Sequence, residues 1–348
     1  MNREFHYYVI HYLALRAGFS DADSCLIASS SQFVDSSTVS HTVDTGRGLY
    51  RTIVTQDYGW WDDSFPRTVY VPFHFFPGDP DAPASRRRDG RTNPLNTTAD
   101  STGVKELLVA ALKTRDLYRV GIALHTYADS WAHQNFSGAL EDWNVVDPSL
   151  PIPSIGHAQA LRTPDLPEAV WRDGRLESET VRNHERHLAA ARKIYKYLST
   201  YNRRPFHDVD EVMGELEEIL DYHRPGRTAE ERILDLIIAA DIRKYSRREW
   251  FAEALVNPKG LGDDESALDK GYDKLLWLKD AALHRTTLFR RAPMRARDQF
   301  SRSHLYLWNE AAREHLGTAW QILPRRLYRL LGGDPEELRS GSRRGPTA

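Results

Sequence analysis

One stretch constrains this chain more than any other: residues 124–136, Leu-His-Thr-Tyr-Ala-Asp-Ser-Trp-Ala-His-Gln-Asn-Phe. It places His125, Asp129 and His133 at two successive i,i+4 steps. On a helix each such step turns the side chain by only about 40°, so the three project from one face. The residues just before them, 120–124, are mostly apolar and predict a buried helix. Two imidazoles and a carboxylate are unfavourable to bury unless a metal ion or hydrogen bonds compensate, so the stretch predicts the spine of a metal site.

Composition limits how such a site is built and where the protein is expected to work. The chain has 348 residues, 41% of them hydrophobic, which is ample for a core. Its single cysteine, Cys25, excludes an intrachain disulfide and any cysteine-rich zinc finger, so the metal ligands must be histidines and carboxylates. No apolar run approaches the roughly 18 residues that span a bilayer, and the first residues do not resemble a secretory signal. We therefore predict no transmembrane segment and a cytoplasmic protein. The formal net charge of −2 makes nucleic acid an unexpected partner.

The spacing of apolar residues predicts a mainly α fold with long loops and at most a minor β-hairpin. β-branched and aromatic stretches between 38 and 75 are expected to form that hairpin or extended loops. His74, bracketed by Pro72 and Pro77, is expected on a stiff, non-helical segment. Helices are predicted at 4–17, 20–30, 103–113, 116–134, 177–200, 208–222, 228–254, 265–289 and 297–322.

The helices divide the chain into a histidine-rich front half and a helical back half. Residues 1–175 are expected to form a metal-site core, and 176–330 a helical region that packs on it within one continuous domain. Residues 331–348 are expected to be a flexible tail.

The histidines are unevenly distributed along the chain. Seven of the fourteen lie at or before position 157, several of them in apolar or aromatic surroundings. A single histidine of that kind is more often a hydrogen-bonded core residue than a ligand. The prediction of a metal site rests on several residues together. A buried His-x3-Asp-x3-His face needs further ligands, and the front half supplies additional histidines and aspartates. His184 and His187 lie in a charged helical stretch and are expected to face water.

An ordered set of motifs resembles the zinc-dependent phospholipase C and single-strand-specific zinc nuclease superfamily. In chain order the motifs are Phe5-His6-Tyr-Tyr, Ser31-Gln-Phe-Val-Asp35, Pro72-Phe-His74, Leu124-His125-x3-Asp129-x3-His133-Gln134 and Gly156-His157. More closely, the chain looks like an uncharacterised microbial family that carries the His-x-Tyr-Ala-Asp-x-Trp-Ala-His-Gln helix. The resemblance covers roughly residues 4–170. It implies a phospholipase C-like fold, in which several helices surround a cluster of two or three zinc ions.

The resemblance also assigns ligands residue by residue. His6 matches the early histidine, and Asp35 matches the aspartate that shares a metal with His74 and His125. Asp129 matches the bridging carboxylate. His133 and His157 would hold a second metal, with Asp165 as the best candidate for the last carboxylate. Four residues beside the ligands are expected to orient them or to contact substrate: Tyr127, Trp131, Gln134 and Asn135.

Three functions are compatible with these residues. The first is a metal-dependent hydrolase of a small phosphoester, in which Asp129 bridges metals and Asp35 acts as general base. The second is a non-hydrolytic metalloenzyme, either an iron oxygenase or a zinc Lewis-acid catalyst. The third is a structural metal in a chain whose back half binds a protein partner. A structural zinc needs one closed set of four ligands, so a surplus of candidate ligands favours catalysis. Imidazole and carboxylate suit zinc, and also iron or manganese.

Overall fold

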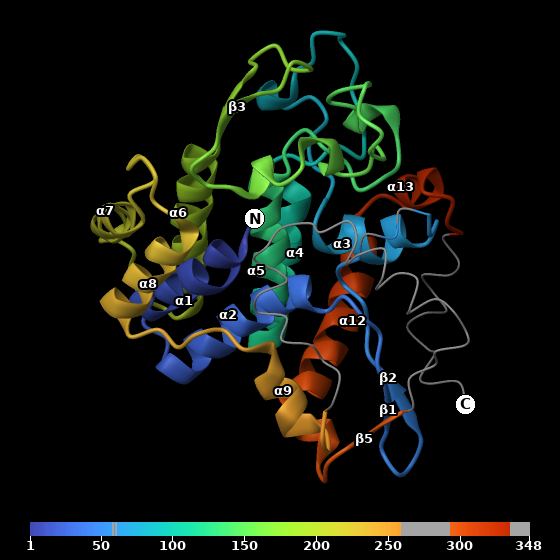
Figure 1. The fold of residues 1–348 in the computed structure, drawn as a ribbon, viewed down its shortest axis with the longest axis vertical. Coiled ribbons are helices and arrows are strands. Elements are labelled where there is room, and N and C mark those ends of the chain that lie inside the picture. Colours follow the sequence, from blue (N-terminus) through green and yellow to red (C-terminus); the bar gives the residue numbers. More distant parts are fainter. Residues whose placement is uncertain (58, 60, 259–292, 335–348) are drawn as a thin grey trace.

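The computed structural model describes residues 1–348 except 58, 60, 259–292 and 335–348. Within that part of the chain the fold is mainly helical, as predicted, with small strands at its edges (Figure 1). The α-helices are α1 Ile10–Arg16, α2 Asp21–Ser36, α3 Val71–Phe73, α4 Thr102–Thr114, α5 Leu117–Ala132, α6 Asn183–Tyr201, α7 Val209–Leu220, α8 Ala229–Ala240, α9 Arg247–Ala254, α12 His304–Ile322 and α13 Arg325–Leu330. Two π-helical segments are η1 Glu4–Val9 and η2 Pro66–Tyr70, and short 3₁₀ turns are η3 Pro83–Ser85, η4 Asp142–Asn144, η5 Ala158–Ala160, η6 Thr163–Asp165 and η8 Phe300–Arg302.

Helix α5 is the central element of the fold. It begins after Asp116, whose carboxylate accepts a hydrogen bond of 2.9 Å from the amide of Tyr118 and caps the helix. Every residue from Val120 to Ser130 is buried. Helices α2, α4, α6 and α12 all pack against α5 (Figure 1). The face predicted to carry the metal ligands is therefore enclosed by helices from both halves of the chain.

Gly121 allows α2 to approach α5 very closely. A Cβ atom at Gly121 would lie 2.3 Å from the carbonyl oxygen of Ile27 and 2.5 Å from Cβ of Ser30, so no side chain fits there. Because of this contact, the last turn of α2, with Asp35, lies beside the ligand face of α5.

The predicted hairpin is present, but it is shorter than expected. Strands β1 (Thr42–Asp44) and β2 (Leu49–Arg51) pair antiparallel, and β5 (Met294–Arg295) pairs parallel to β1. A second antiparallel pair joins β3 (Val170–Arg172) to β4 (Thr180–Arg182).

The prediction that His74 lies outside a helix is confirmed for His74 itself, but the residues just before it are helical. Residues 66–73 form η2 and α3, and His74 is the residue at which that helix ends. Pro66 stands in the first turn, where a missing N–H is tolerated, so it starts the helix rather than breaking it. The amides of His74 and Phe75 both bond to the carbonyl of Tyr70, at 2.9 and 2.8 Å.

Other helix boundaries also differ from the prediction. The helix expected over 228–254 is interrupted: α8 ends at Ala240, Asp241 takes a left-handed φ of 51°, and α9 begins only at Arg247. Helix α2 continues to Ser36 rather than stopping near 30. The helix predicted at 265–289 lies outside the described residues.

The back half of the described chain packs directly on the front half. Helix α6 contacts α1 and α5, α8 contacts η1, and α12 contacts α3, α4 and α5. Helices of both halves contribute to one apolar cluster, which includes Leu13, Leu124, Leu198 and Leu236. Among the described helices, none combines the length and hydropathy that a bilayer crossing requires.

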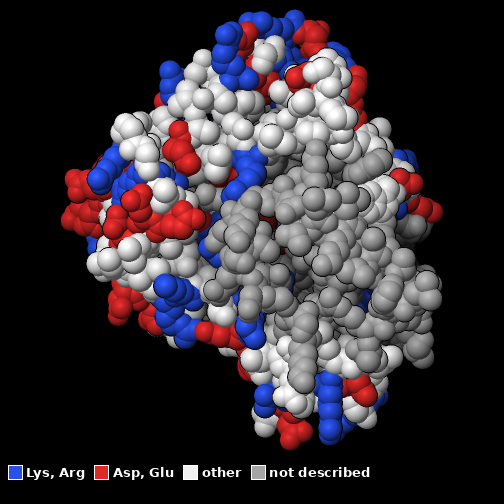
Figure 2. Space-filling view, in the orientation of Figure 1, with Lys and Arg blue, Asp and Glu red and all other residues white. Residues whose placement is uncertain are grey.

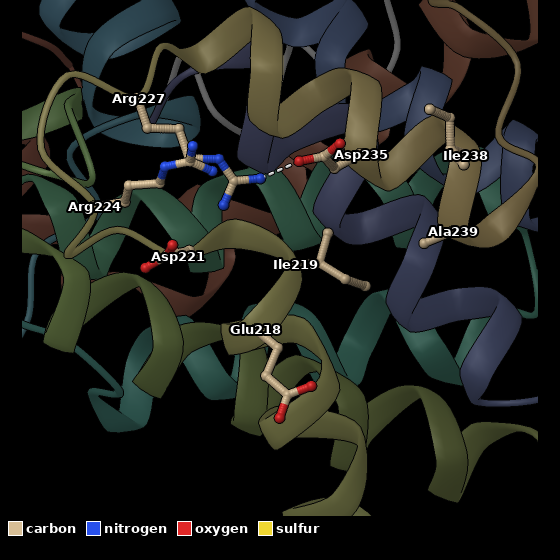
Figure 3. A pocket seen from close by; sticks show the side chains of 8 residues that line it. All are labelled: Glu218, Ile219, Asp221, Arg224, Arg227, Asp235, Ile238 and Ala239. Atoms are coloured by element: carbon tan, nitrogen blue, oxygen red, sulfur yellow. Dashed lines mark hydrogen bonds and ion pairs between the residues drawn. The ribbon is translucent and has the colours of Figure 1, made fainter.

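Acidic side chains gather over α7 and α8 on the face drawn in Figure 2. The exposed ones are Asp210, Glu211, Glu217, Glu218, Glu230, Glu231 and Asp235. Between these two helices lies a recess whose lining includes Arg227, ion-paired to Asp235, and the apolar Ile219 and Ile238 (Figure 3). None of the residues that line the recess is a predicted metal ligand.

Candidate metal centre

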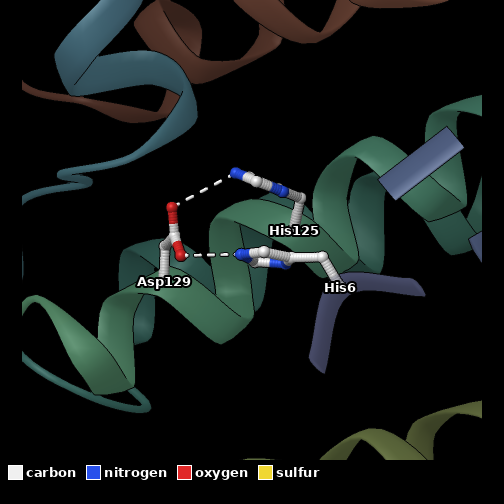
Figure 4. Close-up of side chains that lie close together, drawn as sticks. All are labelled: His6, His125 and Asp129. Atoms are coloured by element: carbon white, nitrogen blue, oxygen red, sulfur yellow. Dashed lines mark hydrogen bonds and ion pairs between the residues drawn. The ribbon is translucent and has the colours of Figure 1, made fainter. Parts of the chain in front are cut away.

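The ligand face of α5 meets the N-terminal helix at a buried pair of histidines. Asp129 lies beside the pair and faces both rings: its Oδ1 lies 3.1 Å from Nε2 of His6, and its Oδ2 lies 3.2 Å from Nε2 of His125 (Figure 4). The two imidazole rings stack with centroids 3.8 Å apart. All three side chains are at most 1% exposed. His6, which is 119 positions earlier in the chain than His125, thus completes the first of three groups able to hold a metal ion.

A second group combines the end of α2 with the end of α3. Oδ1 of Asp35 lies 3.6 Å from Nε2 of His125 and 3.9 Å from Nδ1 of His74. Those two ring nitrogens are 3.2 Å apart. His125 therefore belongs to both groups, while Asp129 also reaches this one, with Oδ2 3.0 Å from Nδ1 of His74.

The third group lies one turn further along α5. Nε2 of His133 is 3.1 Å from Oδ1 of Asp165, and Nε2 of His157 is 3.4 Å from Oδ2 of the same carboxylate. Gly156, with φ of 50°, permits this approach, because a Cβ there would lie 2.5 Å from the ring of Phe75. The 3₁₀ turns η5 and η6 bring Asp165 back to His157 across a spacing longer than a helical turn.

Together, the three groups include all eight predicted ligands. The structure brings Asp35, His74 and His125 together in one group and His133, His157 and Asp165 in another, while His6 and Asp129 lie in the remaining one with His125. The carboxylates of Asp35 and Asp165 are each 19% exposed, whereas Asp129 is 1% exposed. The centre is therefore open to solvent at its two outer carboxylates and closed at Asp129.

In three of the five histidines, the ring nitrogen that points away from the carboxylates is hydrogen-bonded to a backbone carbonyl oxygen. Nε2 of His74 lies 2.8 Å from the carbonyl oxygen of Thr55. Nδ1 of His133 lies 2.9 Å from that of His74, and Nδ1 of His157 lies 2.7 Å from that of Leu161. A carbonyl oxygen only accepts, so each of these nitrogens carries the proton. In the neutral imidazole, the nitrogen that faces the carboxylates then holds a lone pair, as in ligands oriented for a metal.

The short distances between the imidazole nitrogens and the carboxylate oxygens require a positive charge between them. Burial raises the pKa of Asp129, but the charges of His133 and the Met1 amino group outweigh it and hold the pKa well below its usual value. Burial lowers the pKa of His74, yet the hydrogen bond to Asp129 and the negative charges of Asp129 and Asp35 together outweigh it, so the net pKa is raised. Lone pairs of imidazole and carboxylate repel each other at 3.0–3.2 Å unless a proton or a metal cation lies between them. The donor set of histidine nitrogen and carboxylate oxygen fits zinc.

One polar group at the centre was not predicted from the sequence. The amino group of Met1 bonds to Oδ1 of Asp129 and lies 3.2 Å from Oδ1 of Asp165. Burial lowers its pKa, but the nearby carboxylates raise it to about 10, with Asp129 contributing most. No residue type in the sequence signals such a contact.

The four residues expected beside the ligands have mainly structural contacts. Tyr127 turns away from the ligand face and donates to Asp100 at 2.8 Å. Gln134 donates to the carbonyl of Trp131 at 2.9 Å. In the described part of the chain, the indole N–H of Trp131 and both amide atoms of Asn135 are buried without a hydrogen-bond partner. The structure therefore brings none of the four into hydrogen-bond contact with a ligand.

The expectation that His187 faces water was wrong. The side chain is 1% exposed and lies edge-to-face on Phe5, with ring centroids 5.6 Å apart. The sequence does contain a pattern that predicts its burial: His187, Ala190, Ala191 and Ile194 follow the i, i+3, i+4, i+7 spacing of a buried helix face. His184, in contrast, is only half-buried.

The residue that anchors His157 is held in an unfavourable backbone conformation. Leu161 has φ of 54° and ψ of −130°, a region that glycine adopts freely and a leucine rarely does. Such strain is worth about 1–3 kcal/mol, and it delivers the Leu161 carbonyl to Nδ1 of His157.

Leu161→Gly is therefore expected to raise the free energy of unfolding by about 1 kcal/mol in urea titrations, because the strain is relieved and little apolar contact is lost. Leu161 is 56% exposed and Leu49 is 58% exposed, so Leu49→Gly is a matched control. Leu49 lies in strand β2 and does not have a positive φ, so glycine there is expected to destabilise. Equal destabilisation by both changes would contradict the assignment of strain.

Comparison with known proteins gives a family but no function. The model of a family of unknown function, DUF6765, matches residues 1–323. No curated protein and no solved structure matches the chain.

Proposed function

We propose that this chain, which belongs to the DUF6765 family, is a metal-dependent hydrolase that acts on a phosphoester and uses a cluster of two or three zinc ions. One observation carries the proposal. Three adjacent sets of imidazole nitrogens and carboxylate oxygens converge, and in three of the five histidines a backbone carbonyl fixes the free lone pair toward the carboxylates. A structural zinc needs only one closed set, so the extra ligands support a catalytic role.

The proposed ligands are the eight residues of the three groups. Asp35, His74 and His125 would hold one ion, since Nε2 of His125 has a single lone pair and can bind only one. His133, His157 and Asp165 would hold a second, and His6 with Asp129 would hold a third. Bound zinc would polarise the phosphoryl oxygen and lower the pKa of water toward neutrality.

The chain's own residues have distinct proposed roles in the reaction. Asp129 is buried, and its two oxygens contact His6 and His74, respectively. Its carboxylate would therefore set the distance between the two ligand groups to which these histidines belong. Asp35 is partly exposed at the open side of the centre, so its carboxylate would take a proton from the attacking water. The stacked ring of Phe75 on His133, at 4.7 Å, would exclude water from one wall of the third group.

A phosphoester suits this centre better than an uncharged substrate. Two cations held a short distance apart stabilise both the attacking and the leaving oxygen during displacement at phosphorus. Because Asp129 contacts His6 on one oxygen and both His74 and His125 on the other, the ions of those groups would be close neighbours. The positive charge of the ions would balance the negative charge of the phosphoester.

Metal removal tests this function directly. Protein purified without chelator is expected to contain two or three zinc ions per chain and to hydrolyse members of a panel of phosphomonoesters and phosphodiesters. Dialysis against a chelator is expected to abolish hydrolysis and to lower the melting temperature, because a ligand bound only by the native state stabilises it by about 4 kcal/mol at 1,000 times its dissociation constant. Zinc should restore both properties.

Metal content and hydrolysis also distinguish the hydrolase from the two alternative functions. Iron with a visible absorption band would indicate the oxygenase chemistry, and one tightly held zinc without hydrolysis would indicate a structural metal. A folded wild-type protein that neither contains nor takes up metal would overturn the proposal.

A further inference from the structure

We propose that His315, on α12, is a positioning residue for the metal centre: it fixes the segment that carries His74. The inference rests on the proposed metal centre, and it gives the C-terminal helix a role in it. His315 belongs to none of the three ligand groups and lies 241 positions after His74 in the chain.

His315 makes direct contact with the segment just before His74. Its side chain is 2% exposed, and its Nε2 lies 3.0 Å from the carbonyl oxygen of Pro72. The ring also stacks on Phe73, with centroids 5.1 Å apart and an interplanar angle of 26°. Since the carbonyl accepts, Nε2 carries the proton and donates it.

The carbonyl of Pro72 depends on side chains for hydrogen bonds. The helix ends at His74, and the amides of His74 and Phe75 both bond to Tyr70 instead. Besides His315, the hydroxyl of Thr126 lies 3.4 Å from the Pro72 oxygen and 3.2 Å from Nε2 of His315. A buried carbonyl at a helix end is unfavourable without such partners, so α12 and α5 together fix this helix end.

The fixed segment connects two of the ligand groups. The ring of His74 belongs to the group with Asp35 and His125, while its backbone carbonyl accepts from Nδ1 of His133 in the third group. Thr126 is also the neighbour of His125 on α5. A backbone shift at Pro72 would therefore move the ring of His74 directly. It would also disturb the hydrogen bond from His133 to the His74 carbonyl, which orients the His133 ring.

The test compares zinc affinity in variants that leave every ligand in place. His315→Phe keeps a ring to stack on Phe73 but removes the N–H. It is expected to weaken zinc binding by about 10- to 100-fold, the usual effect of losing a group that orients a ligand. His315→Gln retains an amide donor and is expected to recover most of the affinity. Zinc affinity is measured by competition with a chromophoric chelator, and the geometry by the visible spectrum of the cobalt(II) form.

A matched control comes from the same helix. The indole of Trp320 donates to the carbonyl of Arg67 at 2.8 Å, so Trp320→Phe removes one bond between α12 and the same helical segment, seven residues before His74. It is expected to lower thermal stability while leaving zinc affinity and the cobalt spectrum unchanged. A merely structural role for His315 would make the two variants behave alike.

The outcomes are separable. Wild-type zinc affinity in His315→Phe, while the wild-type protein binds zinc and hydrolyses a phosphoester, would overturn the positioning role alone. A wild-type protein that binds no zinc would overturn the proposed function and this inference together. If His315→Phe does not fold, His315→Asn keeps a polar side chain that is too short to reach the Pro72 carbonyl, and wild-type zinc affinity in that variant would overturn the positioning role.

Discussion

Replacing Asp129 with asparagine is expected to empty the inner part of the metal centre and to reduce hydrolysis by at least about 10³-fold, since water would no longer be activated by the metals. The change keeps the shape of the side chain and removes its charge. Asp129 contacts His6 on one oxygen and both His74 and His125 on the other. Metal content is expected to fall in both groups that use these histidines.

Two other carboxylates give matched controls for this prediction. Asp165→Asn is expected to remove only the ion of the third group, because Asp165 contacts His133 and His157. Asp100 also touches α5, accepting from Tyr127 at 2.8 Å, but it belongs to no ligand group, so Asp100→Asn should keep its full metal content. Metal analysis per chain and turnover of a phosphodiester are measured for all three variants. Full occupancy and full turnover in Asp129→Asn would contradict the role given to this residue.

Local spacing explains why part of the centre could be predicted from the sequence. The placement of His125, Asp129 and His133 on one helix face follows from the period of the helix alone. The mainly α fold and the β1–β2 hairpin were also readable, because they depend on apolar periodicity and on turn residues. His6, Asp35 and His74 were located only through the resemblance, since their approach to α5 depends on packing, including the glycine contact at Gly121.

The remaining features depend on contacts that carry no signal in residue type. Backbone carbonyls orient His74, His133 and His157, and every residue has a carbonyl. The interruption at Asp241 has no glycine or proline to announce it, so periodicity continued the helix through it. Pro72 misled the interpretation of 66–73, because it stands in the first turn of α3, where a proline is tolerated.

The largest change in stability is expected from Arg232 on α8. Its guanidinium donates to Glu4 at 2.8 Å, and both side chains are 1% exposed. Tyr222 donates to the other oxygen of Glu4 at 3.1 Å, and Glu168 accepts from Arg232 at 3.0 Å. Arg232→Ala leaves the Glu4 carboxylate buried without its cation, which costs about 3–5 kcal/mol. The measurement is the free energy of unfolding from urea titrations of the metal-free protein.

Two further variants separate the ion pair from simple loss of packing. Glu4→Gln with Arg232→Met removes both charges and is expected to recover most of the stability, because no uncompensated charge remains. Arg243 and Glu249 form a comparable pair with both side chains 58% exposed, so Arg243→Ala should change stability by less than about 1 kcal/mol. Since Glu4 and His6 lie together in η1, Arg232→Ala is also expected to weaken the group of His6 and Asp129 before the group of His133 and Asp165. Equal weakening of both groups would mean that the ion pair supports the whole fold rather than the N-terminal ligand.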